Sequence, residues 1–167
     1  MTNEVARLHW PGLLARGVVP ALALILALGA GYLKWLDVMA RESHTAAEQS
    51  VAAATDATVK MLSYRPETVD QDLTSAADRL TGGFRQQYTQ LVTDVVAPGA
   101  KQQRISAVAT VPAAASVAAT QNHAVVLVFI NQTTTIGDDA PTQTNSSVRM
   151  SLDRVGDRWL VSQFDPV

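Results

Sequence analysis

Hydrophobic and polar positions along the chain follow three successive patterns, and the first is a run without charge. Gly17 to Leu33 is 17 uncharged residues, bounded by Arg16 and Lys34. At about 1.5 Å per residue the run spans about 25 Å, slightly less than a hydrocarbon core of about 30 Å. Arg16 and Lys34 can reach toward the lipid headgroups, which lengthens the buried segment. The pattern predicts a single transmembrane helix over residues 17–36.

A cleaved signal peptide is the alternative for this run, because Ala27 and Gly29 offer small residues before a cut. The run is longer than a typical signal core, however, and the bulky segment Tyr32 to Leu36 continues the helical pattern. We therefore expect an uncleaved anchor. Lys and Arg are balanced on its two sides, so orientation rests on the short tail, residues 1–16, which we place in the cytoplasm. The C-terminal domain is then expected on the extracytoplasmic side of the cell membrane.

The second pattern is helical and begins directly after the anchor. No Gly or Pro occurs from Tyr32 to Arg65, so residues 37–62 are predicted to form a stalk that runs into the first domain helix. We expect Asp37–Gln49 to be solvated and Val51–Leu62 to pack on the domain. A paired coiled coil is the alternative, but the apolar seam is poor, which favours a single helix. Residues 63–167 are predicted to be the remainder of the domain.

Two further helices follow Pro66. Thr68 and Gln71 have the spacing of a capping box at the start of the first, and Gly82-Gly83 ends it. Pro98-Gly99 is expected to end the second. The predicted buried positions are Val69, Leu73, Ala76, Ala77 and Leu80 in the first helix, and Phe84, Tyr88, Leu91, Val92 and Val95 in the second.

The third pattern alternates with a period of two after Lys101 and predicts four strands. Pro112 indicates an edge or a bulge in the first strand. The second contains six apolar residues, Val125 to Ile130, and Gly156-Asp157 is a two-residue hairpin turn between the last two. That turn places Trp159 and Val161 on the core face. Three helices followed by such a meander predict an α+β fold, with helices on one face of a curved four-stranded antiparallel sheet, as in the conical NTF2-like architecture.

Composition and charge narrow the functional classes. Residues 37–167 carry ten Lys and Arg against fourteen Asp and Glu, a net charge of −4, so nucleic acid is not an expected partner. The chain has no cysteine, which excludes disulfides, cysteine-based zinc sites and a thiol nucleophile.

Four residues are candidates for acid–base chemistry inside such a cone: Tyr64, Tyr88, Asp94 and His123. Each also has a structural interpretation. The tyrosines have core spacing and are expected to reach backbone groups with their hydroxyls, Asp94 to be solvated, and His123 to lie in a turn. The histidines lack metal-ligand spacing, and no phosphate loop, dinucleotide fingerprint or G-x-S-x-G occurs. We therefore expect no catalytic, cofactor-binding or metal-binding residues, no cofactor and no enzymatic activity.

The domain resembles the Mce-associated membrane proteins, which accompany mammalian-cell-entry lipid transporters. The resemblance rests on short segments in a fixed order behind one N-terminal span: Leu62-Ser63-Tyr64 with Pro66 and Thr68, Asp72-Leu73, Leu80-Thr81-Gly82 with Phe84 and Tyr88, Val95–Pro98, Asn131–Thr135 and Arg158–Val167. Arg65 and Gly83 depart from the acidic residues expected there. The resemblance implies the anchor topology, the NTF2-like fold and a supporting role beside a lipid transporter.

The expected function is that of a non-enzymatic accessory subunit that assembles or stabilises an Mce-type lipid-transport complex in the cell envelope. Its expected partners are Mce-family proteins, their permease subunits and the lipid bilayer. Two alternatives stay open: a VirB8-like scaffold subunit of a secretion or conjugation machine, and a SnoaL-like small-molecule enzyme. Polar groups inside the cone would favour the enzyme, and a dry or collapsed cone would favour a scaffold.

Overall fold

The computed structural model describes residues 19–167. The predicted cytoplasmic tail, residues 1–16, lies outside the described residues. Of the predicted membrane segment, residues 17–36, the backbone from Val19 onward is helical, but most of the side chains are not described, so the crossing of a membrane stays a prediction. No helix within the described part of the chain has both the length and the apolarity needed to cross a membrane. The first described helix, α2, is Val19–Leu62, and its C-terminal turns belong to the compact unit Glu42–Val167.

The sheet has four antiparallel strands in the order β1-β2-β3-β4, as the alternation predicts. The strands are β1 (Ile105–Ala119), β2 (His123–Ile136), β3 (Thr142–Val155) and β4 (Arg158–Pro166). Pro112 lies in a register shift of the edge strand β1, between Thr110 and Ala113, which confirms the predicted bulge. Gly156 has a φ of +62°, the left-handed conformation that the hairpin turn between β3 and β4 requires. This turn pairs Val155 with Arg158 and sets the register of the last hairpin.

One face of the sheet is buried and forms half of the core. The buried side chains from β2, β3 and β4 are Ala124, Val126, Val128, Ile130, Val148, Met150, Leu152, Trp159 and Val161. Trp159 pairs with Arg154 and Val161 with Leu152, as counted back from the turn. The alternation of burial within β2 follows from the single covered face. The strand's six-residue apolar run is buried only at every second position, and Phe129 is 45% exposed, because only one face of this sheet is covered.

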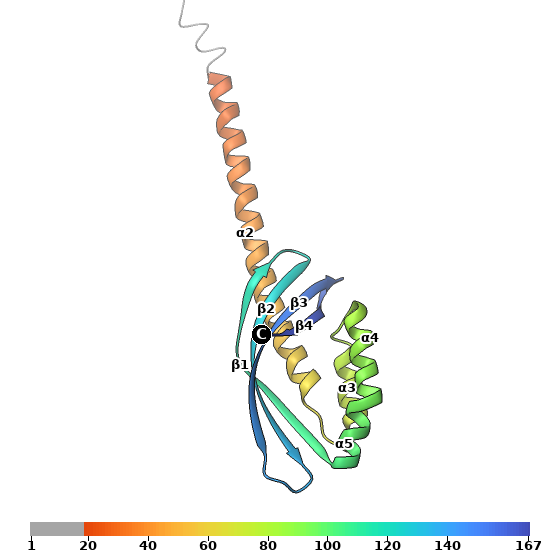
Figure 1. The fold of residues 1–167 in the computed structure, drawn as a ribbon. Helices are drawn as coiled ribbons and strands as arrows, with labels where there is room; N and C mark the ends of the chain where they lie inside the picture. The colour runs from red at the N-terminus through yellow and green to blue at the C-terminus, as the bar shows by residue number, and fades with distance from the viewer. Residues whose placement is uncertain (1–18) are drawn as a thin grey trace, which may run out of the picture. The chain divides into compact units, whose positions relative to one another are not determined.

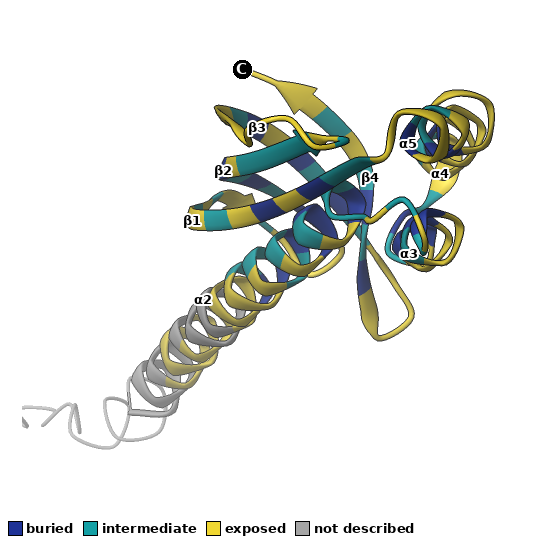
Figure 2. Cartoon of the chain, turned by 90° about the horizontal axis from the view of Figure 1, so that it is seen from below, coloured by how far each residue is buried: buried dark blue, intermediate teal, exposed yellow. Residues whose placement is uncertain are grey.

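Helices cover that buried face (Figures 1 and 2). After α2 come α3 (Val69–Ala77), α4 (Gly82–Leu91), a π-helical segment η2 (Val92–Val96) and α5 (Ala97–Gln103). The predicted inner positions of α3 and the following turn, Val69 to Leu80, are all buried. The predicted capping box is wrong. The Thr68 hydroxyl donates to the Asp72 carboxylate at 2.6 Å, and no side-chain hydrogen bond caps the helix.

The last helix does not end at Pro98-Gly99, contrary to the expectation. Pro98 lies in the first turn of α5, where its missing N–H is not needed, and the helix continues until Arg104, which has a φ of +52°. The π-helical turn η2 adds a residue per turn and changes which side chains face the core. Val95, within this segment, is consequently 59% exposed; Leu91, at the end of α4, is 53% exposed, while Tyr88 and Val92 are buried.

The C-terminal half of α2 is a structural part of the domain. Burial begins at Ala46, inside the stretch expected to be solvated, and the buried positions are Ala46, Ser50, Ala54, Ala57, Thr58 and Met61. These side chains are mostly small, so the helix can approach the sheet closely. Thr58 Oγ1 lies 3.2 Å from Met150 Sδ in β3. After the helix, Tyr64 exchanges two 2.9 Å backbone hydrogen bonds with Ala107, which covers the start of the β1 edge.

Candidate interaction surface

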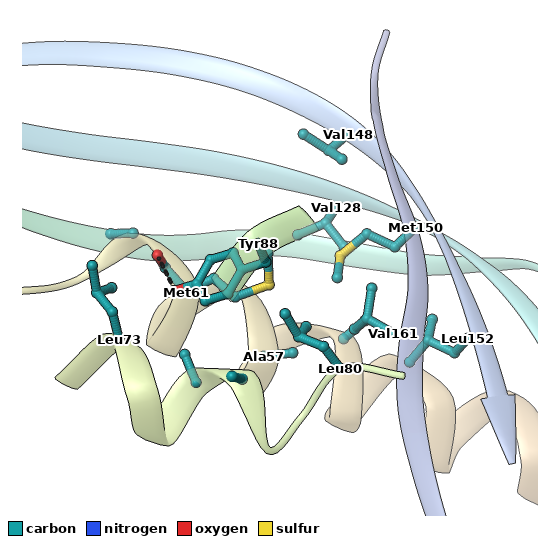
Figure 3. Packing of buried hydrophobic residues seen from close by; sticks show 14 of the residues in the cluster. Ala57, Met61, Leu73, Leu80, Tyr88, Val128, Val148, Met150, Leu152 and Val161 are labelled. Atoms are coloured by element: carbon teal, nitrogen blue, oxygen red, sulfur yellow. Dashed lines mark hydrogen bonds between the residues drawn. The ribbon is translucent and has the colours of Figure 1, made fainter. Parts of the chain in front are cut away.

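The space between the sheet and the helices, where a conical fold could hold a substrate, is filled by side chains (Figure 3). Among them, Leu73, Leu80, Met150 and Leu152 are almost completely buried. The buried polar side chains, Ser50 and Thr58, each donate a hydrogen bond to a carbonyl of their own helix. Among the described residues, no buried side-chain polar atom lacks a hydrogen-bond partner. The interior of the described domain therefore offers no free polar group for chemistry.

Two of the four candidate residues meet at the edge of this core. The buried Tyr88 hydroxyl donates to the carbonyl oxygen of Met61, 3.3 Å away, as Figure 3 shows, which confirms the expected backbone contact. Burial raises the pKa of Tyr88 far above its ordinary value, and the nearby Tyr64 adds to the increase. Burial also raises the pKa of the half-buried Tyr64. Both phenols are therefore protonated at neutral pH and are poor general bases.

The other two candidates lie elsewhere. Asp94 is exposed in η2, as expected. His123 is exposed at the start of β2, and its Nδ1 lies 2.7 Å from Oδ1 of Asp153, its partner in β3. The hydrogen bond from His123 lowers the pKa of Asp153, with a smaller contribution from Ser162, while partial burial opposes the decrease. Sequence spacing could not reveal this pair, because 30 residues separate its members and only the strand register joins them.

Surface pockets and ion clusters give no better catalytic candidate. A pocket of about 270 Å³ lies between the end of α2, α3 and β1, with Lys60, Arg65 and Asp72 in its wall. The Asp72 carboxylate already accepts hydrogen bonds from Thr68 and from the Arg65 backbone. No three His, Asp or Glu residues in the described part of the chain are grouped as metal ligands.

The uncovered face of the sheet has a different composition from the rest of the domain. No Lys, Arg, Asp or Glu occurs from Ile105 to Ile136, which includes all of β1 and β2. Apolar side chains are nevertheless exposed there, among them Val108 at 57% and Phe129 at 45%. We define the outer sheet face as Val108, Ala113, Ala115, Val125, Leu127 and Phe129. Depletion of charge together with exposed apolar groups is characteristic of the central part of protein interfaces, so this face is the candidate interaction surface.

The fold of the domain is similar to that of VirB8-like proteins. An IcmL-like type IV secretion system protein from Legionella pneumophila superposes with a TM-score of 0.60 and 12% identity, over 72% of this chain and 92% of that chain. VirB8 of Agrobacterium tumefaciens superposes with a TM-score of 0.56 and 13% identity, over 70% and 88%. At these identities the similarity concerns the fold alone.

Sequence relatives define the family. Residues 13–154 match the family described as uncharacterized Rv1363c/MT1408-like proteins, and the chain belongs to it. It is 56% identical over 160 residues to outer membrane protein Rv1973 of Mycobacterium tuberculosis, covering 96% of this chain and 100% of that protein. It is also 38% identical over 156 residues to uncharacterized protein Rv1362c of the same species, covering 89% and 71%.

Proposed function

We propose that this protein is a non-enzymatic, membrane-anchored subunit that assembles or stabilises an Mce-type lipid-transport complex in the cell envelope. The observation that carries the proposal is the filled interior. In a conical fold a substrate needs space and polar groups between sheet and helices. Here that space holds packed apolar side chains such as Leu80, Met150 and Leu152. Such a core supports a binding role at the surface and disfavours the SnoaL-like enzyme.

Attachment to a membrane is the second part of the proposal. The uncharged run within residues 17–36 supports an anchor, and the relative named outer membrane protein Rv1973 supports a place in the envelope. An anchor confines the domain to a layer of envelope, which raises its effective concentration near other anchored proteins. Weak contacts can then be sufficient for assembly.

The Mce transporter as partner rests on the sequence resemblance. The matching segments have structural roles in the fold. Gln132, in the Asn131–Thr135 segment, donates to the last carbonyl of α2 at 3.2 Å, and Trp159 and Val161, in the C-terminal segment, are buried. The segments that carry the resemblance therefore help to hold the helices on the sheet.

A second candidate function is a scaffold subunit of a secretion or conjugation machine. The superposition on an IcmL-like type IV secretion system protein and on VirB8 favours it. Both candidates require a surface that binds protein and a location beside a membrane. They differ in the complex that the protein joins.

A deletion strain complemented with either the full-length chain or residues 42–167 tests the proposal. We expect the deletion to lower the abundance of Mce-type subunits or lipid import, the full-length chain to restore both, and the shorter chain to restore them poorly. The full-length protein, purified in mild detergent, should retain Mce-family proteins or their permease. Unchanged transporter levels and import in a strain without a paralogue would contradict the proposal. Co-purification with a secretion channel would instead favour the second candidate.

A further inference from the structure

We propose that a patch of uncharged polar side chains on the uncovered face of the sheet binds a neutral polysaccharide. The amide patch is defined by its residues, which come from three neighbouring strands: Thr110, Asn131, Thr133, Gln143 and Asn145. This inference goes beyond the proposed function and does not depend on which envelope complex the protein joins. It rests on the register of the strands, on the lack of charge and on the chemistry of the side chains.

The strand register brings the amide patch together from segments that are far apart in the sequence. Asn131 in β2 pairs with Thr110 in β1 on one side and with Asn145 in β3 on the other. Two residues further along β2, Thr133 pairs with Gln143 in β3. Because paired residues point to the same face of a sheet, these side chains are neighbours. The patch is therefore continuous across three strands.

Alternation along β2 turns the patch away from the core. Gln132 donates a hydrogen bond to the carbonyl oxygen of Leu62 at 3.2 Å, and Ile130 is buried. The residues between and beyond them, Asn131 and Thr133, lie on the opposite face of the sheet. The helices leave that face open (Figure 2). The patch side chains are exposed, apart from the half-buried Thr133, so their polar groups are available to a ligand.

The lack of charge selects the kind of ligand. No Lys, Arg, Asp or Glu occurs in residues 105–136 or in residues 140–148. A charged ligand would need an opposite charge on the protein to compensate for its loss of water. An apolar ligand would leave the amides of the patch without hydrogen-bond partners. The patch therefore suits a neutral ligand that is itself rich in hydrogen-bonding groups.

A neutral polysaccharide meets this requirement. Each of its hydroxyls can both donate and accept, and the same is true of the amide and hydroxyl side chains of the patch. Phe129 lies on the same face, two residues before Asn131, and is 45% exposed. Its partner in β1 is Ala113, whose small side chain leaves the aromatic ring open on that side. A sugar ring can pack its apolar C–H face on an aromatic side chain while its hydroxyls reach the neighbouring amides.

Retention of the full-length chain on polysaccharide beads tests the binding. One set of beads carries a neutral arabinogalactan, a second carries dextran, a third carries a charged polyuronate, and a fourth is blank. The detergent should have a polyoxyethylene headgroup, because a maltoside would itself offer sugar hydroxyls. We expect retention on at least one neutral polysaccharide, competed away by the same polysaccharide in solution, and none on the polyuronate or blank beads. Lack of retention on both neutral polysaccharides, or equal retention on all four kinds of bead, would overturn the proposal.

Substitutions locate the site. Asn131→Ala and Asn145→Ala, made separately, should each raise the dissociation constant for the retained polysaccharide by about threefold to tenfold, the effect of losing a hydrogen bond. Gln163→Ala is the matched control, because Gln163 is an exposed amide of β4 outside the patch. Circular dichroism checks folding, and Gln143→Ala replaces either variant if it fails to fold. Unchanged binding by the patch variants, or an equal loss in Gln163→Ala, would contradict the assignment.

A protein is the competing occupant, with the amide patch as the polar rim of an interface on the outer sheet face. Asn131→Ala would then reduce the co-purification of envelope proteins and leave retention on the polysaccharide unchanged, and the polysaccharide proposal would be wrong. If the full-length chain binds polysaccharide through the patch but retains no Mce-type subunit, this inference stands and the proposed function fails. The two proposals can therefore be tested separately.

Discussion

His123 and Asp153 show how a single contact depends on its surroundings. The two side chains are partly exposed and meet only because β2 and β3 pair in one register. Exposed ion pairs contribute little to stability, since water and salt screen them. The short distance and the lowered pKa of Asp153 therefore indicate a local contact at the end of a hairpin, and we assign it no catalytic role.

A double-mutant cycle with His123→Ala and Asp153→Asn should give a coupling energy of about 0.2–1 kcal/mol at neutral pH. The lowered pKa of Asp153 means that the folded state favours the carboxylate. The stabilisation is therefore present above the ordinary aspartate pKa of about 4 and is lost as pH falls through the lowered value. Urea unfolding across this range measures it. A coupling that stays constant down to about pH 2 would contradict the assignment.

At the scale of elements, helix α2 illustrates why side-chain size matters as much as apolarity. Its buried face contains alanines, a serine and a threonine, whereas the sheet beneath supplies the larger side chains. A helix with small inward residues approaches a sheet more closely than one with leucines. Close approach brings Thr58 within hydrogen-bonding distance of Met150 Sδ, so little room is left for any added group.

Replacing Ala54 by Leu should therefore destabilise the domain by about 1–3 kcal/mol, the usual cost of overpacking a core. Ala52→Leu is the matched control, because Ala52 is exposed two residues earlier on the same helix, where the change should be within about 0.5 kcal/mol. The two variants have the same helix propensity, so packing accounts for the difference. Urea unfolding midpoints give both values. Equal midpoints would show that this turn of α2 is not packed on the sheet.

For the whole molecule, Glu42, the first residue of the compact unit, marks where the independently folding domain is expected to begin. Glu42–Val167 contains every buried residue of the described core, including the inward side chains of α2 from Ala46 to Met61. A chain that begins at residue 63 would expose the inner face of the sheet to water. Exposing apolar surface to water costs about 25 cal/mol per Å². Because a native domain is only marginally stable, it cannot tolerate the loss of stability that exposing a whole sheet face would cause.

We accordingly expect residues 42–167 to fold alone and to unfold in one cooperative transition, and residues 63–167 to remain unfolded or to aggregate. Circular dichroism and urea titration distinguish these outcomes. Cooperative unfolding of the shorter chain would mean that α2 is dispensable for the core. A non-cooperative transition of residues 42–167 would mean that the domain needs more of the chain.

The sequence by itself determined the features that depend only on neighbouring residues in the chain. Alternation placed Met150, Leu152 and Val161 on the inner face, and the Gly156 turn set the register of the last hairpin. Both follow from backbone sterics within a few residues. Tyr88 was also assigned correctly to packing, because helical spacing decides which side of α4 it occupies.

Only the tertiary structure decided which faces are covered. The helical pattern of Leu91 and Val95 predicted burial, yet both are exposed, Val95 within the π-helical turn. The apolar run of β2 is likewise open on one side. Burial depends on what packs against an element from distant parts of the chain, and a local pattern does not contain that information. The outer sheet face, the His123–Asp153 pair and the filled interior could be identified only after the strands and helices had been brought together.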